Sequence, residues 1–169
     1  MNVMVADSSA FLDLQRGGFL EKCLGLPYQF TVPDLLCRAE LVNRTTGSGL
    51  VPLGLRVEEL NGDEVSSAMR FRRQLPTICL QDSFALALAT IRRWILLTSD
   101  DVIRAFASSM SVACRSVLWM IDQLFYAGVA NAESLVSGLS ALQSHPGCRI
   151  PHNEIAVRID HFSSTAKLP

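Results

Sequence analysis

The fold is decided by the stretch VMVADSSAFLDL, residues 3–14. Residues 3–6 form an uninterrupted apolar run that ends at Asp7. Such a run is typical of a strand that is buried on both faces of a parallel sheet. Residues 8–16 then have the apolar spacing of a helix, which Gly17 and Gly18 end. The stretch therefore predicts a strand, an acid and a helix in direct succession.

The same alternation continues along the chain. Further strands are predicted at 28–32, 55–60 and 94–97, and further helices at 34–41, 64–74, 79–93 and 102–107. The interval 43–54 is rich in Gly, Thr and Pro and is expected to be a mobile loop. From about residue 116 the spacing is helical, with breaks at Gly128 and at residues 145–147. Alternating strands and helices are the pattern of an open α/β sheet.

Length and composition set the class of protein. The 169 residues suggest one domain, which we place at 1–162, with a helical C-terminal extension from about 128 and a polar tail at 163–169. The 15 Lys and Arg balance 16 Asp and Glu, which excludes a strongly basic nucleic-acid arm and an acidic disordered tail. No apolar run is long enough to cross a bilayer and the first residues lack a signal-peptide pattern, so we expect a cytoplasmic protein without a membrane partner.

Four acids stand where a ligand site forms in such a sheet. Asp7 and Asp100 follow predicted strands and should share one edge, whereas Glu40 and Asp82 lie on helices beside apolar neighbours. Carboxylates that converge repel one another unless cations neutralise them, and Mg²⁺ or Mn²⁺ prefers oxygen ligands. Such ions can activate water against a phosphodiester. Taken alone, Asp7 and Asp100 could each cap a helix and Glu40 could pair with Arg44. A structural explanation is weaker for Asp82, which a nearly uninterrupted apolar run follows.

Four segments resemble one family, the PIN-domain ribonucleases. They are VADSSAFLDL around Asp7, VPDLLCRAEL around Glu40, QDSFALALA around Asp82 and WILLTSD around Asp100. Their order and spacing agree with the family over residues 3–127, and the helical C-terminal part looks like that of bacterial proteins of the VapC type. The resemblance implies a three-layer α/β/α fold with a central, mainly parallel sheet. It further implies a Mg²⁺- or Mn²⁺-dependent endoribonuclease, the toxin of a toxin–antitoxin pair, which forms a homodimer and binds an antitoxin protein.

The resemblance also assigns roles to individual residues. Asp7, Glu40, Asp82 and Asp100 become the metal-binding catalytic acids. The hydroxyl groups that orient these acids or a bound water are those of Thr98 and of Ser8 or Ser9. Asp101 either helps at the metal or caps a helix, and we favour the cap. Cys79 occupies the position where a Ser or Thr cap of the Asp82 helix is expected.

Other side chains are candidates for contacts with RNA or a partner. Arg38 and Arg44 lie near Glu40 and the predicted loop, where they could hold a substrate strand. Arg92 ends a predicted helix, so an interaction with the helix dipole is favoured over a phosphate contact. The apolar stripe of Leu135, Leu139 and Leu142 is a candidate surface for a partner.

Two other functions compete with the ribonuclease. One is a PIN-like module that binds RNA or protein but has lost turnover, although the intact acids argue against it. The other is a phosphoaspartate fold, because Asp7 follows the first strand. A phosphatase of that kind needs an acid where this chain has Ser9, and a receiver domain needs a lysine after a late strand, where this chain has none.

Overall fold

A parallel sheet forms the centre of the molecule. The computed structural model describes residues 2–41 and 49–165, without the side chains of residues 40 and 41. In this part of the chain five strands lie in the order β3-β2-β1-β4-β5, and all neighbours are parallel. The strands are β1 (Asn2–Ala6), β2 (Tyr28–Pro33), β3 (Arg56–Glu58), β4 (Ile95–Leu97) and β5 (Cys114–Arg115). In the middle of β1, Met4 pairs with Phe30 on one side and Ile95 on the other.

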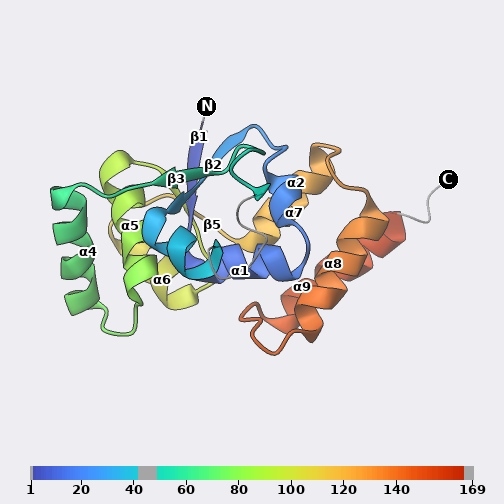
Figure 1. The fold of residues 1–169 in the computed structure, drawn as a ribbon. Helices are drawn as coiled ribbons and strands as arrows, with labels where there is room; N and C mark the ends of the chain where they lie inside the picture. Colours follow the sequence, from blue (N-terminus) through green and yellow to red (C-terminus); the bar gives the residue numbers. More distant parts are fainter. Residues whose placement is uncertain (1, 42–48, 166–169) are drawn as a thin grey trace.

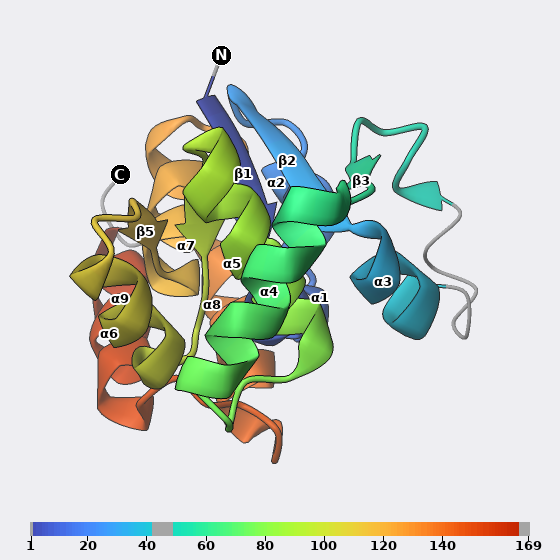
Figure 2. The same ribbon diagram turned by 90° about the vertical axis from the view of Figure 1, so that its left-hand side faces the viewer.

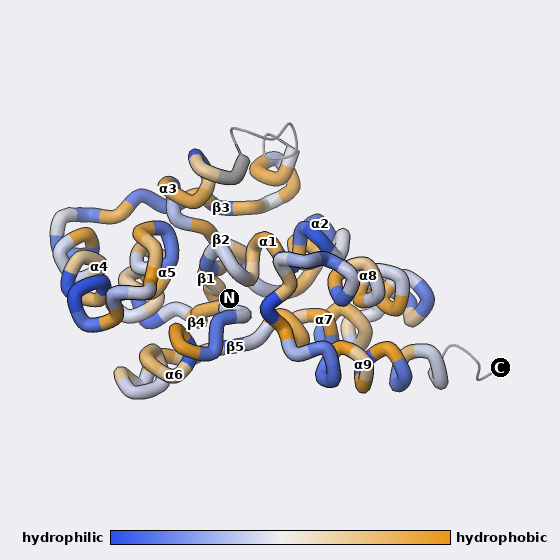
Figure 3. Tube along the Cα trace, turned by 90° about the horizontal axis from the view of Figure 1, so that it is seen from below, coloured by the Kyte–Doolittle hydropathy of each residue, from blue (hydrophilic) through white to orange (hydrophobic). Residues whose placement is uncertain are grey.

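Helices cover both faces of the sheet, which confirms the predicted three-layer α/β/α fold (Figures 1 and 2). One face carries α4 (Gly62–Gln74), α5 (Leu80–Arg92) and α6 (Asp101–Ser109). The other carries α1 (Ser8–Arg16), α2 (Leu20–Cys23), α7 (Val117–Tyr126), α8 (Ala132–Ser144) and α9 (His152–Thr165). Seen from below, the strands run between these two groups of helices (Figure 3). A short α3 (Asp34–Leu36) and a π-helical turn, Cys37–Leu41, follow β2.

Each face of the sheet has its own hydrophobic core. Val5 and Leu96 pack with the residues of α4, α5 and α6, whereas Met4 and Leu97 pack with the second group of helices. Successive side chains of a strand point to opposite faces, so a strand between two helical layers favours apolar residues on both faces. This is the physical reason for the continuous apolar runs in the sequence.

The C-terminal helices belong to the second core. Leu135, Leu139 and Leu142 on α8 are fully buried in it, together with Phe162 of α9. The interpretation of this leucine stripe as a surface for a partner is therefore wrong. Helix α9 continues to Thr165, beyond the start of the predicted tail at 163, and residues 166–169 lie outside the described part of the chain.

Several local features differ from the expectations. The short elements α2 and β5 were not predicted, and the helix expected at 34–41 is a single α-turn followed by a π-helical turn. Residues 42–48 of the expected loop lie outside the described residues. Among the helices that the structure describes, none has the length and apolar character needed to span a membrane.

Candidate functional site

The site begins where β1 ends. Asp7 is fully buried and caps α1, because its Oδ1 accepts hydrogen bonds from the Ala10 amide at 2.8 Å and the Ser9 hydroxyl at 2.8 Å. The backbone amide of Asp7 donates to the Leu97 carbonyl at 3.1 Å, which fixes the end of β1 beside the end of β4. An acid that follows a buried strand is thus held in the interior by the helix that it caps.

Asp82 enters the same site from the first turn of α5. Its Oδ1 accepts the Ser8 amide at 2.8 Å and the Ser8 hydroxyl. Cys79 is the N-cap of α5, and its Sγ accepts the Asp82 amide at 3.4 Å. The cap predicted at this position is therefore made by a thiol. The two consecutive serines therefore bond different acids: Ser8 donates to Asp82 and Ser9 donates to Asp7.

Asp7 and Asp82 influence each other electrostatically. Burial and, to a smaller extent, the charge of Asp82 together raise the pKa of Asp7 to about 7, against the hydrogen bonds that Asp7 accepts. A carboxyl group in this position gains stability from a proton or from a bound cation. Asp7 Oδ2 is buried and has no partner with hydrogen-bond geometry among the described residues, although the nearby Thr98 hydroxyl lowers the pKa of Asp7.

Asp100 is the third acid at this edge of the sheet and lies between the end of β4 and the start of α6. Its Oδ1 accepts the amides of Val102 at 2.9 Å and Ile103 at 3.1 Å, so Asp100 is the N-cap of α6. The Asp100 amide donates to the hydroxyl of buried Thr98 at 3.0 Å. Its Oδ2 forms an ion pair with Arg149 Nη1 at 3.0 Å. Both carboxylate oxygens of Asp100 therefore have partners in the protein.

The cap role that we favoured for Asp101 is wrong, since Asp100 caps α6. Asp101 is the first residue of α6, with a side chain 70% exposed and paired with Arg104. It does not line the cavity described next. Thr98 and Ser9, by contrast, lie inside the site, and Ser9 Oγ also accepts the Ser99 amide at 3.0 Å.

A cavity of about 670 Å³ opens in front of these acids. Among the predicted site residues that the structure describes, Ser8, Ser9, Asp82 and Asp100 line it, and Asp7 lies buried behind it. Sequence reasoning missed three further charged residues of the wall, Asp13, Arg16 and Arg149. Asp13 carries a signal that could have been noticed, because it is an acid between two leucines of α1 with an arginine three positions later.

Buried polar atoms without partners are concentrated here. In the described part of the chain they are Asp7 Oδ2, Asp13 Oδ2 and Ser99 Oγ. Asp13 lines the cavity, and Ser99 is bonded through its amide to Ser9. A buried polar atom without a partner costs free energy, which a ligand at that atom can offset.

The other predicted residues lie elsewhere or outside the described atoms. Arg38 is 70% exposed, pairs with Asp34 Oδ2 at 3.3 Å, and does not line the cavity. The Glu40 backbone lies in the π-helical turn, but its side chain is outside the described atoms, as is the whole of Arg44. The structure therefore brings Asp7, Asp82 and Asp100 to one edge and places neither Glu40's carboxylate nor Arg44.

Comparisons with known proteins agree with this architecture. No model of a known protein family matches the sequence, and no curated protein matches it significantly. A solved PilT N-terminus domain protein from the hyperthermophilic archaeon Sulfolobus solfataricus P2 matches the structure with a TM-score of 0.53 and 17% sequence identity. The match covers 73% of this chain and 94% of that chain. The fold is that of a PilT N-terminus (PIN) domain. At this identity the likeness establishes the PIN fold alone, and the chemistry rests on the residues themselves.

The oxygen donors in this PIN fold suit a hard divalent cation in part. Asp7 and Asp82 are adjacent, charge-coupled carboxylates, and Asp7 Oδ2 is buried without a partner. Among the described side chains, however, no group of three or more His, Cys, Asp or Glu residues is arranged to hold a metal ion. Asp100 Oδ2 is paired with Arg149, and the Glu40 carboxylate lies outside the described side chains. The described donors alone therefore do not make a complete cation site.

Proposed function

We propose that the chain is a metal-dependent endoribonuclease that hydrolyses phosphodiester bonds of RNA. The observation that carries the proposal is the buried, unpartnered Asp7 Oδ2 beside Asp82 behind a cavity of about 670 Å³. Two adjacent buried carboxylates are unfavourable unless a proton or a cation stabilises them. The position at the carboxyl edge of a parallel sheet is where ligands bind in such folds.

Each residue of the site has a separate task in this proposal. Asp7, Asp82, Asp100 and Glu40 would hold Mg²⁺ or Mn²⁺. When bound, such an ion lowers the pKa of a water and stabilises charge on the phosphodiester. Ser8 fixes Asp82 through Oδ1 and leaves Oδ2 without a hydrogen bond from the described residues. Ser9 fixes Asp7 in the same way and joins it to the β4 end through the Ser99 amide.

The biological role proposed for the ribonuclease is that of a toxin in a type II toxin–antitoxin system. Its support is the resemblance of the four acid-containing segments to PIN-domain ribonucleases and of the helical C-terminal part to VapC-type proteins. In this role the protein acts in the cytoplasm as a homodimer, and a cognate antitoxin protein blocks the acidic site. Growth arrest on expression, relieved by co-expression of the product of a neighbouring small gene, tests this part separately.

An RNA cleavage assay tests the enzymatic proposal. Purified protein is incubated with a pool of single-stranded RNA oligonucleotides in Mg²⁺, in Mn²⁺ and in EDTA. We expect cleavage with either ion, none in EDTA, and a loss of at least about 100-fold in Asp82→Asn. Asp160→Asn, in an exposed position on α9, is the matched control and should cleave like the wild type. Equal cleavage by Asp82→Asn and wild type contradicts the proposed site.

A second candidate function is a PIN-fold module that binds RNA or protein without turnover. The observation that favours it is that both carboxylate oxygens of Asp100 have protein partners, because Oδ1 caps α6 and Oδ2 pairs with Arg149. This candidate predicts metal binding without cleavage of RNA under any divalent ion. The same assay therefore distinguishes the two functions.

A further inference from the structure

Two arginines are the only cationic side chains among the described residues that line the cavity, Arg16 and Arg149. We propose that they form a binding subsite for a backbone phosphate of RNA, and that Arg149 exchanges Asp100 for this phosphate when RNA binds. The inference rests on the proposed ribonuclease function and deepens it. It assigns the substrate-binding role to a wall of the cavity that Arg38 does not line.

The negative charge of the cavity wall favours such a cationic subsite for RNA. The described wall carries the acids Asp13, Asp82 and Asp100, which repel the negative charge of each RNA phosphate. A guanidinium group has five N–H donors in a planar fork and can bind a carboxylate and a phosphate together. Arg16 can therefore bring a phosphate close to the acids while it stays paired with Asp13.

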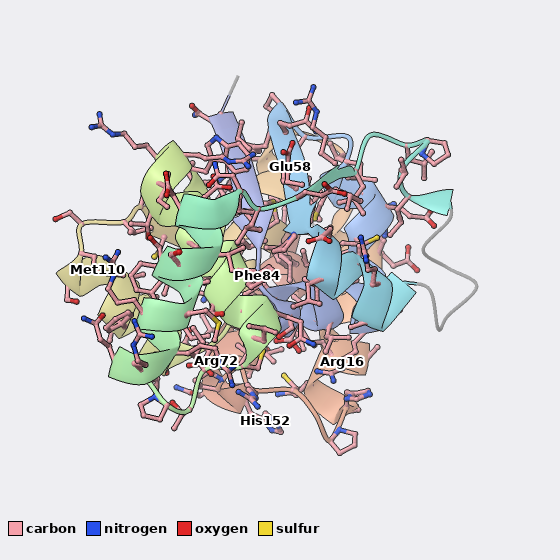
Figure 4. All side chains as sticks on the ribbon, turned by 60° about the vertical axis from the view of Figure 1, so that its left-hand side comes forward. Arg16, Glu58, Arg72, Phe84, Met110 and His152 are labelled. Carbon is pink, nitrogen blue, oxygen red and sulfur yellow. The ribbon has the colours of Figure 1, made fainter. Side chains whose placement is uncertain are left out.

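Arg16 is held in place before any ligand binds. Its Nη1 donates to Asp13 Oδ1 at 3.0 Å and to the Gly147 carbonyl at 2.8 Å, and its side chain is 23% exposed. The side chain lies beside the segment that joins α8 to α9 (Figure 4). Its Nε and Nη2 make no hydrogen bond with the described residues, so they remain as donors for a ligand.

Gly147 has a specific reason to be glycine. A Cβ at this position would lie 2.7 Å from Arg16 Nη2 and 3.1 Å from its Cζ. The closest atom is the end of a flexible side chain, so a Gly147→Ala variant would move the guanidinium group rather than disrupt the fold. This substitution displaces the charge of Arg16 without removing it.

Arg149 is held much more loosely than Arg16. Its side chain is 68% exposed, and its bond to Asp100 Oδ2 at 3.0 Å is its one hydrogen bond to the described residues. Exposed ion pairs contribute little to stability, typically about 0.2–1 kcal/mol, so exchange of the partner is inexpensive. Loss of Arg149 frees Asp100 Oδ2, while Oδ1 keeps its bonds to the start of α6.

This exchange couples RNA to the cation site. Without RNA, Arg149 is the counter-ion of Asp100 and competes with a divalent cation for Oδ2. With RNA, the phosphate takes the guanidinium group and Asp100 becomes free to bind the cation. Removal of Arg149 must therefore weaken RNA binding and strengthen cation binding, two opposite effects that a purely structural residue does not produce.

RNA affinity in EDTA gives the first test. A fluorescent, 2′-O-methylated single-stranded RNA is titrated with wild type, Arg149→Gln and Arg93→Gln. Arg93 is an exposed arginine at the opposite end of α5 from Asp82 and serves as the control. We expect Arg149→Gln to bind about tenfold more weakly, with a salt-dependence slope smaller by about 1, and Arg93→Gln to bind like the wild type.

Mn²⁺ affinity without RNA gives the second test. Calorimetric titration of Arg149→Gln should show Mn²⁺ binding about two- to fivefold tighter than in the wild type, as expected when a competing exposed ion pair is removed. Gly147→Ala should lower RNA affinity about threefold or more with little change in the melting temperature, because the atoms nearest to the added Cβ belong to the side chains of Arg16 and His145.

Each remaining result counts against a defined part of the account. Unchanged or absent RNA binding in the first test overturns the phosphate subsite. Unchanged, weaker or absent Mn²⁺ binding in the second test overturns the exchange. A wild type that shows the expected RNA binding but cleaves no RNA overturns the proposed enzymatic function and leaves the subsite intact.

Discussion

At the scale of single residues, Asp7 determines the chemistry of the site. It is fully buried, its Oδ2 is unpartnered, and its pKa is raised to about 7 by burial and by Asp82. The same residue caps α1 through Oδ1. One side chain therefore supports the fold with one oxygen and offers the other to a ligand.

The raised pKa predicts how stability depends on pH. Between about pH 4 and pH 7 the folded state keeps a proton on Asp7 that the unfolded state has released, so stability falls by about 1.4 kcal/mol per pH unit as pH rises. Asp7→Asn retains a capping oxygen and has no charge to bury. We expect it to be more stable than the wild type by about 4 kcal/mol at pH 8 and nearly equal to it at pH 4 in urea unfolding with EDTA present. Parallel pH profiles for the two proteins would count against the raised pKa.

At the scale of elements, the helix starts position the site. α1, α5 and α6 begin at one edge of the sheet, with Asp7, Cys79 and Asp100 as their caps. The thiol cap of α5 is the weak member of this set, because sulfur is a poorer acceptor than oxygen.

Replacement of this cap should stabilise the protein. Cys79→Ser puts a hydroxyl oxygen at a position where Ser is among the preferred residues, and we expect an increase of about 0.5–1 kcal/mol in the free energy of unfolding. Cys79→Ala removes the acceptor and should be less stable than Cys79→Ser. Thermal unfolding of the three proteins measures the order, and a Cys79→Ser protein less stable than wild type contradicts the assigned cap.

A second element-scale feature joins α4, α5 and β3. Arg92 at the end of α5 bonds both oxygens of buried Glu64, at 2.6 and 3.0 Å, and Glu58 Oε2 at 2.8 Å. Glu64 also forms the capping box of α4 with Asn61. The expectation that Arg92 serves the helix dipole missed these partners.

Loss of the Glu64 charge should destabilise the fold. The hydrogen bond from Arg92 lowers the pKa of Glu64, so its carboxylate stabilises the protein above its ordinary pKa, and this contribution is lost as pH falls through the lower folded value. Glu64→Gln should cost about 2 kcal/mol at pH 7 in urea unfolding and less at pH 3. Asp63→Asn, at the exposed neighbouring position, should change stability by less than about 0.5 kcal/mol. A loss that is the same at both pH values contradicts the role of the charge.

Elements with a strong local pattern were predictable. The apolar runs ending at Asp7 and Thr98 gave β1 and β4, because a strand between two helical layers favours apolar residues on both faces. By contrast, β5 has two residues and one of them is charged, so it carries no such pattern. The π-helical turn that contains Glu40 has no sequence signature that distinguishes it from an α-helix.

At the scale of the whole molecule, the site is assembled from both ends of the chain. The acids come from β1, α5 and the end of β4, whereas Arg149 comes from the segment between α8 and α9, which Figure 1 shows on the same side as the carboxyl ends of the strands. The convergence of Asp7, Asp82 and Asp100 was predictable because parallel strands end at one edge. The contact of Arg16 with Gly147, 131 positions away, was not, because it depends on the packing of α8 against α1.

The central claim is that the Asp7–Asp82 pair is built to hold a divalent cation. Calorimetric titration with Mn²⁺ at pH 8, without RNA, tests it most directly, with Asp160→Asn as the control at an exposed carboxylate. We predict saturable binding by wild type and Asp160→Asn, and binding at least about tenfold weaker in Asp7→Asn. Equal affinity in Asp7→Asn and wild type, or no binding by either, would contradict the claim.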